Sequence, residues 1–370
     1  MLQASDEFKS MLHSSHVIWV KASLVDAATD SVIETFDVVD GAIQIDGRSN
    51  AWRTLDVTVA SPFTEALDKI DVTGAIRIDR GVSHGSQPPT EWITLGTFYV
   101  QETRREYESG TVAIAAADIG QTIEDYSLIT PYAPQYADQQ MTFVQAITEL
   151  IRAVHPSAVV EVGDGVDTAM TTAVGTVFTG SRWDAINQLG NGLGAVVHTT
   201  TRNTFRIDKI IEGGEPVWFF HSNEAGTLVG VTSVRSRREQ YNAVQVRWET
   251  PNGTGMAFVV DSDPESPTYW DGPFGRKPAA EESLPEVDSH EAGLAAARAM
   301  LTQHKGFARS VNFKSVANPL IEPYDVVRIS TPDGNSEDHI IDSISLDLTA
   351  ASMSAETRMV RTVVPTRSRA

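Results

Sequence analysis

The stretch of residues 243–307 constrains the fold more than any other part of this chain. Within residues 243–249, apolar Val and Trp side chains alternate with Gln, Arg and Glu. A period of two places the apolar side chains on one face of an extended chain, which is the pattern of a half-buried β-strand. Asn252-Gly253 supplies the positive-φ residues of a tight turn before a second run over 256–260, so the sequence predicts a β-hairpin.

A long loop, residues 261–278, follows the hairpin. Its Pro and Gly residues exclude a helix or a central strand. Its aromatic residues argue against disorder, because disordered segments are poor in aromatics. We therefore expect the loop to lie against a neighbouring surface. Tyr269, Trp270 and Phe274 are the candidate interface residues, since aromatic side chains serve as anchors at interfaces.

The same loop carries three acidic residues, Asp261, Asp263 and Glu265. An EF-hand would place Gly at the sixth position and Glu at the twelfth, where this chain has Ser266 and Gly272. Two interpretations remain open for the loop. One is irregular calcium coordination between Asp261 and Glu265, and the other is a set of Asx-type turns before the prolines.

A helix is predicted after the loop. Asp288 with Glu291 fits a capping box. Apolar residues recur at helical spacing up to Leu301, and residues 304–306 suit the C-terminal end of a helix.

Short alternating segments fill the N-terminal part of the chain. Residues 1–15 are expected to form a short polar helix or arm. Candidate strands follow over 16–24, 42–47, 55–59, 76–79, 92–100 and 111–117. Short strands at regular spacing, with turn residues between them, predict an antiparallel β-sandwich or barrel.

The pattern changes in the middle of the chain. Residues 141–154 predict a helix that opens with a capping box of Thr142 and Gln145. A second helix is expected from Ser181, and a hairpin over 195–207. The sequence therefore predicts a smaller α+β domain in the middle of the chain.

Strands return from about Val231, so we predict a mainly β fold in which two antiparallel β-barrel or sandwich domains flank a smaller mixed domain. The expected divisions are an N-terminal β-barrel domain at 1–125, an α+β domain at 126–225, a second β-barrel domain with the long loop and helix at 226–357, and a basic C-terminal tail at 358–370. A layout of strand, charged turn and alternating strand at 95–118 returns at 326–353, which is consistent with two similar β modules. Four tryptophans are expected in the core: Trp92, Trp183, Trp218 and Trp248.

The tail carries Arg358, Arg361, Arg367 and Arg369 without acidic residues close by. Two interpretations remain open, a solvated terminus and an arm that docks on an acidic neighbour. In the second, Arg361 and Arg367 are candidate interface residues.

The charge balance excludes one class of partner. The chain has 29 basic and 49 acidic residues, a formal net charge of −20. A broad basic face for nucleic acid is therefore excluded, although such a chain is compatible with a passage through which DNA slides without sticking. The absence of cysteine excludes disulfides, thiolate zinc sites and a cysteine nucleophile. We expect a soluble protein made in the cytoplasm, since neither a signal peptide nor a membrane-spanning run is recognisable.

Catalytic motifs are not recognisable. The glycines at 190–194 follow a helix instead of opening one, which is the wrong end for binding a phosphate. A G-x-S-x-G elbow is missing, and His13 and His16 lack a metal-ligand pattern. We therefore expect no cofactor, no enzymatic activity and no metal site, with calcium at the Asp261–Glu265 loop as the one interpretation left open.

Several short motifs together resemble the baseplate or tail hub proteins of tailed bacteriophages, and the N-terminal part resembles minor tail proteins of phages that infect actinobacteria. The motifs are LGTFYV at 95–100 with 115–118, SRWDAI at 181–186 through 194, DSDPESP at 261–267, NP at 318–319, EPYDVV at 322–327 and AETR at 355–358. Their shared order over most of the chain carries the resemblance. Tyr324 is a departure, because it stands where the usual pattern has Gly.

The resemblance implies a structural protein of the virion tail, synthesised in the host cytoplasm. Such hubs form trimers at the distal end of the tail tube. Two similar barrels per subunit give six quasi-equivalent positions, which match a sixfold tube above and a threefold tip below. The implied partners are further copies of the chain, the tail tube or distal tail protein, the tape measure protein and the tip fibre or spike protein. DNA would pass through the ring without specific binding.

Two other functions stay open. A receptor- or carbohydrate-binding tail protein would need exposed aromatics in a groove, for which Tyr269 and Trp270 are the candidates. A cell-wall hydrolase of the tail tip would need a Cys/His or zinc motif, which the sequence lacks.

Overall fold

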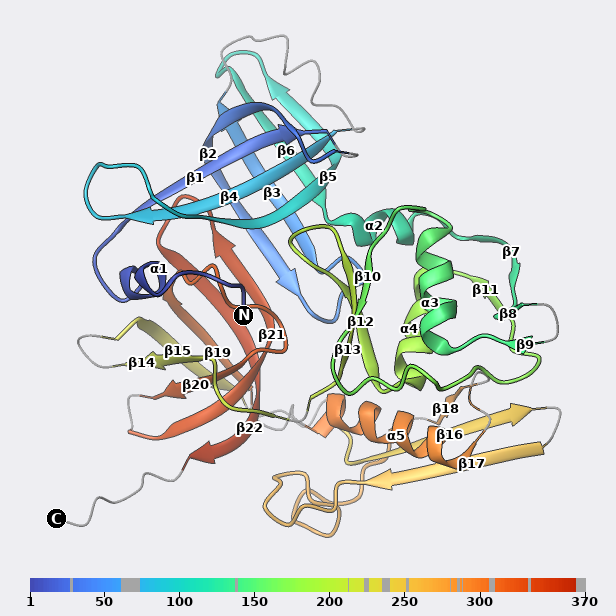
Figure 1. Ribbon diagram of the computed structural model, residues 1–370. Coiled ribbons are helices and arrows are strands. Elements are labelled where there is room, and N and C mark those ends of the chain that lie inside the picture. The colour runs from blue at the N-terminus through green and yellow to red at the C-terminus, as the bar shows by residue number, and fades with distance from the viewer. Residues whose placement is uncertain are drawn as a thin grey trace.

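The computed structural model describes residues 1–26, 29–60, 74–136, 139–211, 213–222, 226–234, 240–250, 253–279, 281–284, 287, 289–305, 310–331 and 334–363. Strands dominate it, and Figure 1 shows one large sheet system beside a smaller part that holds most of the helices. The predicted mainly β fold class is confirmed.

The N-terminal module is built on six strands. Its elements are α1 (Asp6–Met11), β1 (Val17–Val25), β2 (Val32–Asp46), β3 (Arg53–Ala60), β4 (Ala75–Ser83), β5 (Trp92–Glu106) and β6 (Thr111–Ala117). The strands pair antiparallel in the order β1-β4-β5-β6-β3-β2, and β1 also pairs with β2, so the pairings form a closed circuit. Phe8 and Met11 of α1 are buried in the core of this module. Of the two forms expected for residues 1–15, a short polar helix or an arm, the structure has the helix, and it is amphipathic instead of polar because it covers the core.

A second β module follows late in the chain. Its strands are β14 (Trp218–His221), β15 (Leu228–Val234), β19 (Ser310–Val316), β20 (Val326–Ser330), β21 (Ser336–Asp347) and β22 (Ser352–Val363). They pair in the order β14-β20-β21-β22-β19-β15, and β14 runs parallel to β20. Among the described strands no pairing joins β14 to β15, so this circuit stays open there.

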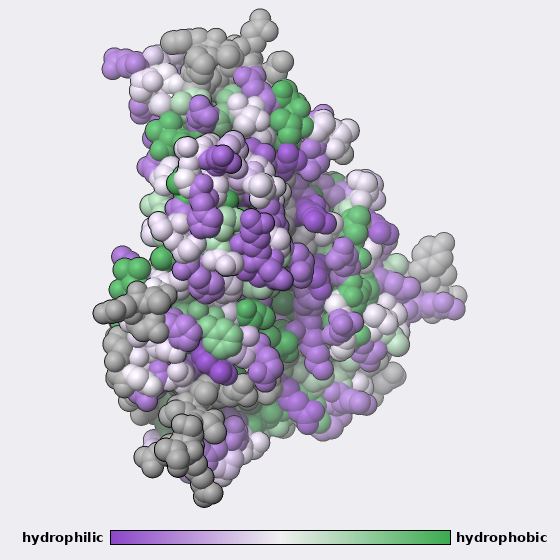
Figure 2. Space-filling view, turned by 60° about the vertical axis from the view of Figure 1, so that its left-hand side comes forward, coloured by the Kyte–Doolittle hydropathy of each residue, from purple (hydrophilic) through white to green (hydrophobic). Residues whose placement is uncertain are grey.

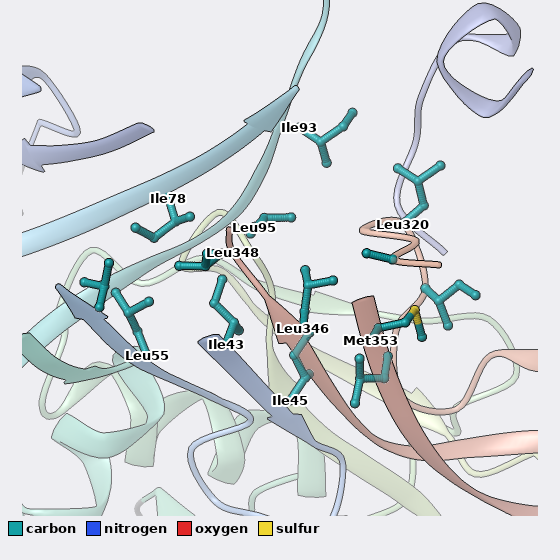
Figure 3. Close-up of a cluster of buried hydrophobic side chains, with 14 of the residues drawn as sticks. Ile43, Ile45, Leu55, Ile78, Ile93, Leu95, Leu320, Leu346, Leu348 and Met353 are labelled. Carbon is teal, nitrogen blue, oxygen red and sulfur yellow. The ribbon is translucent and has the colours of Figure 1, made fainter. Parts of the chain in front are cut away.

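The two β modules are joined through β2 and β21. Residues 42–46 of β2 pair antiparallel with residues 343–347 of β21, which makes one 12-stranded sheet of both modules. Ile43 and Ile45 of β2 and Leu346 of β21 lie together in a common hydrophobic core (Figure 3). Burial of apolar surface along this joint stabilises the two modules as one body.

Figure 1 shows the mixed module beside this sheet system. Its elements are α2 (Ile119–Glu124), β7 (Leu128–Tyr132), β8 (Gln135–Tyr136), β9 (Gln139–Gln140), α3 (Phe143–Arg152), β10 (Val160–Val162), β11 (Phe178–Gly180), α4 (Arg182–Gly192), β12 (Ala195–Thr199) and β13 (Phe205–Lys209). The predicted capping box of Thr142 and Gln145 is confirmed, and Ser181 caps α4 as expected. Both helices bury their apolar faces in one core around Trp183.

The predicted hairpin at 243–260 is confirmed as β16 (Ala243–Thr250) and β17 (Gly253–Val260), with β18 (Glu282–Ser283) beside β16 and α5 (His290–Lys305) packed on the sheet. Trp248 is buried between Gly255 and Gly293. A Cβ on these glycines would lie 2.2 and 2.4 Å from the indole, so both are needed for this packing. At the start of α5, Ser289 Oγ accepts a hydrogen bond from the Ala292 amide, whereas the predicted Asp288 lies outside the described residues.

The pairings group the elements differently from the predicted divisions. β14 precedes the expected boundary at 225/226, yet it pairs with β20 of the second β module. The elements β16, β17, β18 and α5 follow that boundary, yet they form a sheet and a core of their own. β22 runs to Val363, so the first residues of the expected tail at 358–370 are part of the large sheet. The division into domains at 125/126 and 225/226 stays a proposal.

Three of the four tryptophans expected in the core, Trp183, Trp218 and Trp248, are buried. The fourth, Trp92, is only half-buried at the start of β5, with Lys21 Nζ 4.1 Å from the centre of its ring. Its position at a strand end explains the difference, because the ring there reaches the edge of the core instead of its centre.

The two β modules repeat five strands in the same pairing order. The series β4-β5-β6-β3-β2 corresponds to β20-β21-β22-β19-β15. The strand registers within each module show which residues occupy equivalent positions in the two modules. Arg77 of β4 is equivalent to Arg328 of β20, and Glu102 of β5 is equivalent to Ser343 of β21. The correspondence ends at β1, which is antiparallel to β4, whereas β14 is parallel to β20.

Two irregularities of the strands repeat as well, whereas the β4–β5 register shift between Ile78 and Asp79 has no counterpart in β20–β21. The β5–β6 register shifts between Val100 and Glu102, and the β21–β22 register shifts between Ile341 and Ser343 at the corresponding place. The β2–β3 register shifts between residues 38 and 40, and the β15–β19 register between residues 228 and 230, again in correspondence. Because bulges are specific features of a fold, these matches identify an internal structural repeat. The sequence layout matched residues 95–118, which include most of β5 and all of β6, to residues 326–353, which begin with β20. The structural repeat instead matches β5 to β21 and β6 to β22, one strand later in the chain.

Candidate functional site

Four side chains stack in a column beside the joint between β2 and β21. His198 of β12 stacks on Trp52 with ring centroids 4.0 Å apart, and Trp52 stacks on Tyr324 at 5.8 Å. The guanidinium carbon of Arg358 in β22 lies 5.3 Å from the centre of the Tyr324 ring. Since these residues come from the mixed module and both β modules, the column connects all three.

A carboxylate contact closes each end of the column. Arg358 Nη1 donates to Asp342 Oδ1 at 2.8 Å, and both side chains are buried. Burial raises the pKa of Asp342 above its usual value, although Arg358 opposes this shift. At the other end, His198 Nε2 lies 2.8 Å from Asp208 Oδ2. Partial burial opposes ionisation of Asp208, but the hydrogen bonds and charges of His198 and Arg206 lower its pKa.

The backbone of Tyr324 is strained. Its φ is +67°, a left-handed value that is uncommon for a bulky side chain. The Tyr324 amide donates to the Ile341 carbonyl at 2.8 Å, which fixes the turn against β21. Gly47 allows this close approach, because a Cβ there would lie 2.8 Å from Pro323. Tyr324, which departs from the Gly of the usual pattern, therefore keeps a left-handed backbone and contributes a ring to the column.

A buried guanidinium lies directly beside the column. Arg53 is 1% exposed; its Nη1 donates to the Thr199 carbonyl at 2.8 Å and its Nη2 forms an ion pair with Glu322. Asp118 Oδ2 accepts from the Arg53 amide at 2.9 Å and from the Thr199 hydroxyl. Burial raises the pKa of Asp118, against the effect of these hydrogen bonds and of the Arg53 charge. This network is a second link between the three modules.

A third link is made by Arg80 of β4. The side chain is fully buried, and its Nη1 donates to the Asp347 carbonyl at 2.7 Å where β21 ends. Burial lowers the pKa of Arg80 to about 10. A buried cation that binds backbone carbonyls of another module holds the relative position of both.

A cavity of about 770 Å³ opens beside the column. Its walls carry Trp52, Trp92, His198, Arg206, Asp208, Glu322 and Tyr324. In the parts of the chain that the structure describes, no cluster of three or more His, Asp or Glu side chains is placed to hold a metal ion. The same described parts contain no helix long and apolar enough to cross a bilayer. Of the ionisable pairs at the junction, Arg53–Glu322 joins two modules, whereas Arg358–Asp342 and His198–Asp208 each lie within one module and hold the members of the column in place.

In the acidic loop after β17 the hydrogen bonds are those of turns. The Asp261 carboxylate accepts from the hydroxyls of Ser266 and Thr268, the latter at 2.7 Å. Asp263 Oδ1 accepts from the Glu265 amide at 3.0 Å, as in an Asx turn. Asp261 is buried and uses its carboxylate to shape the loop.

The candidate interface residues do not lie together. Tyr269, Trp270 and Phe274 are half-buried in the loop after β17. Trp270 meets Phe258 edge to face at 5.9 Å, and the Arg276 guanidinium lies 5.5 Å from its ring centre. Arg361 belongs to β22 in the large sheet, with its side chain outside the described part of the structure. Arg367 lies outside the described residues.

The residues of the junction were missed by sequence reasoning. One signal was present in Arg53, which shares the inward phase of β3 with Leu55 and Val57 and is buried like them. The second signal was Tyr324 at the position usual for Gly. Arg358, expected in the basic tail, is instead buried and paired with Asp342. Pairing across the sheet, which the sequence alone does not show, brings these residues together.

Comparison with solved structures shows this fold in bacteriophage tail proteins. The tail protein from Neisseria meningitidis MC58 is 13% identical, with 92% of this chain and 96% of that chain covered and a TM-score of 0.63. The 43 kDa tail protein of prophage MuSo2 from Shewanella oneidensis is 15% identical over 92% and 98%, with a TM-score of 0.61. Prophage tail protein gp18 from Listeria monocytogenes EGD-e is 12% identical over 92% and 94%, with a TM-score of 0.58.

These three likenesses span nearly the whole of each chain. The resemblance to phage tail proteins predicted from the order of the motifs is thus confirmed at the level of the fold. No family model and no curated protein matches the sequence.

Proposed function

We propose that this protein is a structural component of a phage tail, a hub that forms a ring of three copies at the distal end of the tail tube. The observation that carries the proposal is the internal repeat of five strands with matched bulges, in a chain with the fold of tail proteins. Two repeated modules in each of three copies give six similar positions around a ring. Such a ring adapts a sixfold tube to a threefold tip.

The junction supports this role because a ring needs both modules at a fixed angle. The column from His198 to Arg358 and the Arg53 network hold the modules through buried contacts. Each module is a β-barrel or part of one in this proposal, with the closed circuit of six strands as the better example. The mixed module and the β16–β17 hairpin with α5 lie outside the ring wall and contact other tail proteins.

The charge of the chain suits a channel. A net charge of −20 repels phosphate, so DNA would pass through the ring without specific binding. The proposed partners are other copies of the chain, the tail tube or distal tail protein, the tape measure protein and the tip fibre or spike protein. The protein acts without catalysis in the virion tail, after synthesis in the host cytoplasm.

The ring is tested by measuring the mass and shape of the purified chain over a range of concentrations. Native mass spectrometry is expected to show three copies, and negative-stain images are expected to show rings with a central hole. A chain that remains monomeric at high concentration, and also in the presence of the tail tube protein, would contradict the proposal.

A further inference from the structure

The internal repeat also predicts how one copy meets the next, an inference that rests on the proposed ring. Within one copy the modules are joined where β2 pairs with β21. The repeat sets β2 against β15 and β21 against β5. A ring of repeated modules uses the same joint at every boundary. The boundary between copies would then join β15 of one copy to β5 of the next.

The strand edges have the geometry for this joint. β21 pairs with β20 from Ser336 to Ile340, and its far half continues past β20 to pair with β2. In the same way, β5 pairs with β4 up to Tyr99, and its far half, residues 102–106, continues past β4. The backbone hydrogen bond at the end of each strand pair occupies the same position in both modules. The Ile341 amide donates to the Asp325 carbonyl at 3.0 Å, and the Val100 amide donates to the Gly74 carbonyl at 3.1 Å.

The partner edge is β15, the last strand of the large sheet. Among the described strands, β15 pairs with β19. Val229 of β15 is 75% exposed at the bulge, where the corresponding Val39 of β2 is 51% exposed. An outer strand whose backbone faces solvent is a template for pairing with another chain.

The register follows from the internal joint. Within one copy, Ala42 pairs with Asp347 and Gln44 with Ser345. Ala42 corresponds to Thr232 and Gln44 to Val234, because these residues pair with matching positions of β3 and β19. Asp347 and Ser345 correspond to Glu106 and Arg104, which are reached through β22 and β6.

We propose that β15 of one copy pairs antiparallel with residues 102–106 of β5 in a second copy, with Thr232 opposite Glu106 and Val234 opposite Arg104. The ring then closes through three such joints between copies and three β2–β21 joints within them. A second copy of this chain is the occupant, because its β5 corresponds to the strand that β2 meets at the internal joint.

The chemistry of the two joints differs. The internal joint buries Ile43 against Leu346, whereas the corresponding residues of the joint between copies are Ser233 and Arg105. Figure 2 shows hydrophilic side chains spread over one face of the molecule, with hydrophobic patches between them. A polar joint suits a surface that must stay soluble before assembly, since backbone hydrogen bonds and charged pairs then supply the specificity. The joint between copies therefore forms by assembly, while the internal one forms by folding.

Cysteine cross-linking tests the register, because the chain has no cysteine of its own. The double variant Thr232→Cys/Glu106→Cys is oxidised and separated without reductant. Opposite residues of an antiparallel pair lie within disulfide reach, so covalent dimers and trimers are expected. The shifted pair Thr232→Cys/Arg104→Cys lies on a diagonal of about 7–8 Å and is expected to give about tenfold less product.

The internal joint supplies the positive control. Ala42→Cys/Asp347→Cys is the corresponding pair within one copy and is expected to form an intramolecular disulfide without covalent oligomers. The chain could have the mass of a trimer and yet cross-link equally through the shifted pair, or through neither pair. That result would contradict the proposed joint without contradicting the proposed hub. A monomer at every concentration would overturn the hub and the joint together.

Discussion

Trp52 and His198 stack almost in parallel, with ring centroids 4.0 Å apart and planes 11° from each other. Trp52 precedes β3 of the first β module and His198 belongs to β12 of the mixed module. Trp52 also stacks on Tyr324 of the second β module, with ring centroids 5.8 Å apart. One indole thus links the mixed module and both β modules, and its removal should loosen their relative positions.

Trp52→Ala is expected to lower the free energy of unfolding by about 3–5 kcal/mol, because a buried indole is lost and a cavity is left. The measurement is urea unfolding followed by circular dichroism. Trp92→Ala is the matched control, since this ring is half-buried at a strand end, and a loss of about 1 kcal/mol is expected. Equal losses in both variants would show that the column has no special role.

Tyr324→Gly separates backbone strain from side-chain packing. Glycine relieves the cost of a φ of +67°, about 1 kcal/mol, but removes the ring between Trp52 and Arg358. We expect a net loss of about 2 kcal/mol in the free energy of unfolding. Asn203→Gly, at a φ of +55° in a turn, is the control and should be neutral or slightly stabilising. A stabilising Tyr324→Gly would refute the structural role of the ring.

Arg53→Ala is expected to cost about 3–5 kcal/mol, because Glu322 and the Thr199 carbonyl lose a buried partner. Arg48→Ala removes an exposed ion pair with Asp46 and is expected to cost less than about 1 kcal/mol. Guanidinium unfolding of both variants at one pH gives the comparison. If the two losses were the same, the buried network would not be what fixes the modules.

Local patterns predicted most elements of the fold, because periodicity and capping act within a few residues. The Thr142–Gln145 box and the hairpin at 243–260 are examples. The assignment of these elements to modules was harder to predict from the sequence. β14 and β16 lie on either side of an expected boundary, and only long-range pairing shows that β14 joins the large sheet while β16 does not.

The candidate site was not predictable from such patterns. Trp52, His198 and Tyr324 are far apart in the sequence. Trp52 and His198 belong to none of the motifs, and Tyr324 stood out only as a departure within EPYDVV. Aromatic residues in a loop drew attention to Trp270 instead, which packs against Phe258. A column across three modules depends on how the modules pack together. The long-range pairing of β2 with β21 determines this packing, and local sequence patterns do not show it.

The acidic loop gives a prediction about metal removal. Asp261→Asn is expected to cost about 1–3 kcal/mol, because the charge that strengthens the hydrogen bonds from Ser266 and Thr268 to Oδ2 is lost, and Oδ1 is replaced by an amide nitrogen that cannot accept. Asp263→Asn, at an exposed turn, is expected to have a small effect. Calcium and a chelator should both leave the thermal midpoint unchanged. A calcium-dependent rise that Asp261→Asn abolishes would restore the calcium interpretation.

The pH dependence of the column should follow Asp208. Its folded-state pKa lies below the usual 3.8, as the net result of opposing burial and the favourable contacts of His198 and Arg206. A carboxyl with a lowered pKa stabilises the folded state above its unfolded pKa, and this stability is lost as pH falls through the folded value. Asp208→Asn should therefore be less stable than the natural chain at neutral pH by about 1 kcal/mol, and the gap should close at acid pH.

Urea unfolding of both chains between neutral pH and the acid limit of folding measures this gap. Glu108→Gln is the matched control, because Glu108 is exposed in the turn between β5 and β6, and its curve should run parallel to that of the natural chain. A gap that widens toward acid would mean that the carboxylate of Asp208 opposes folding, and its contact with His198 would then not be what positions the His198 ring in the column.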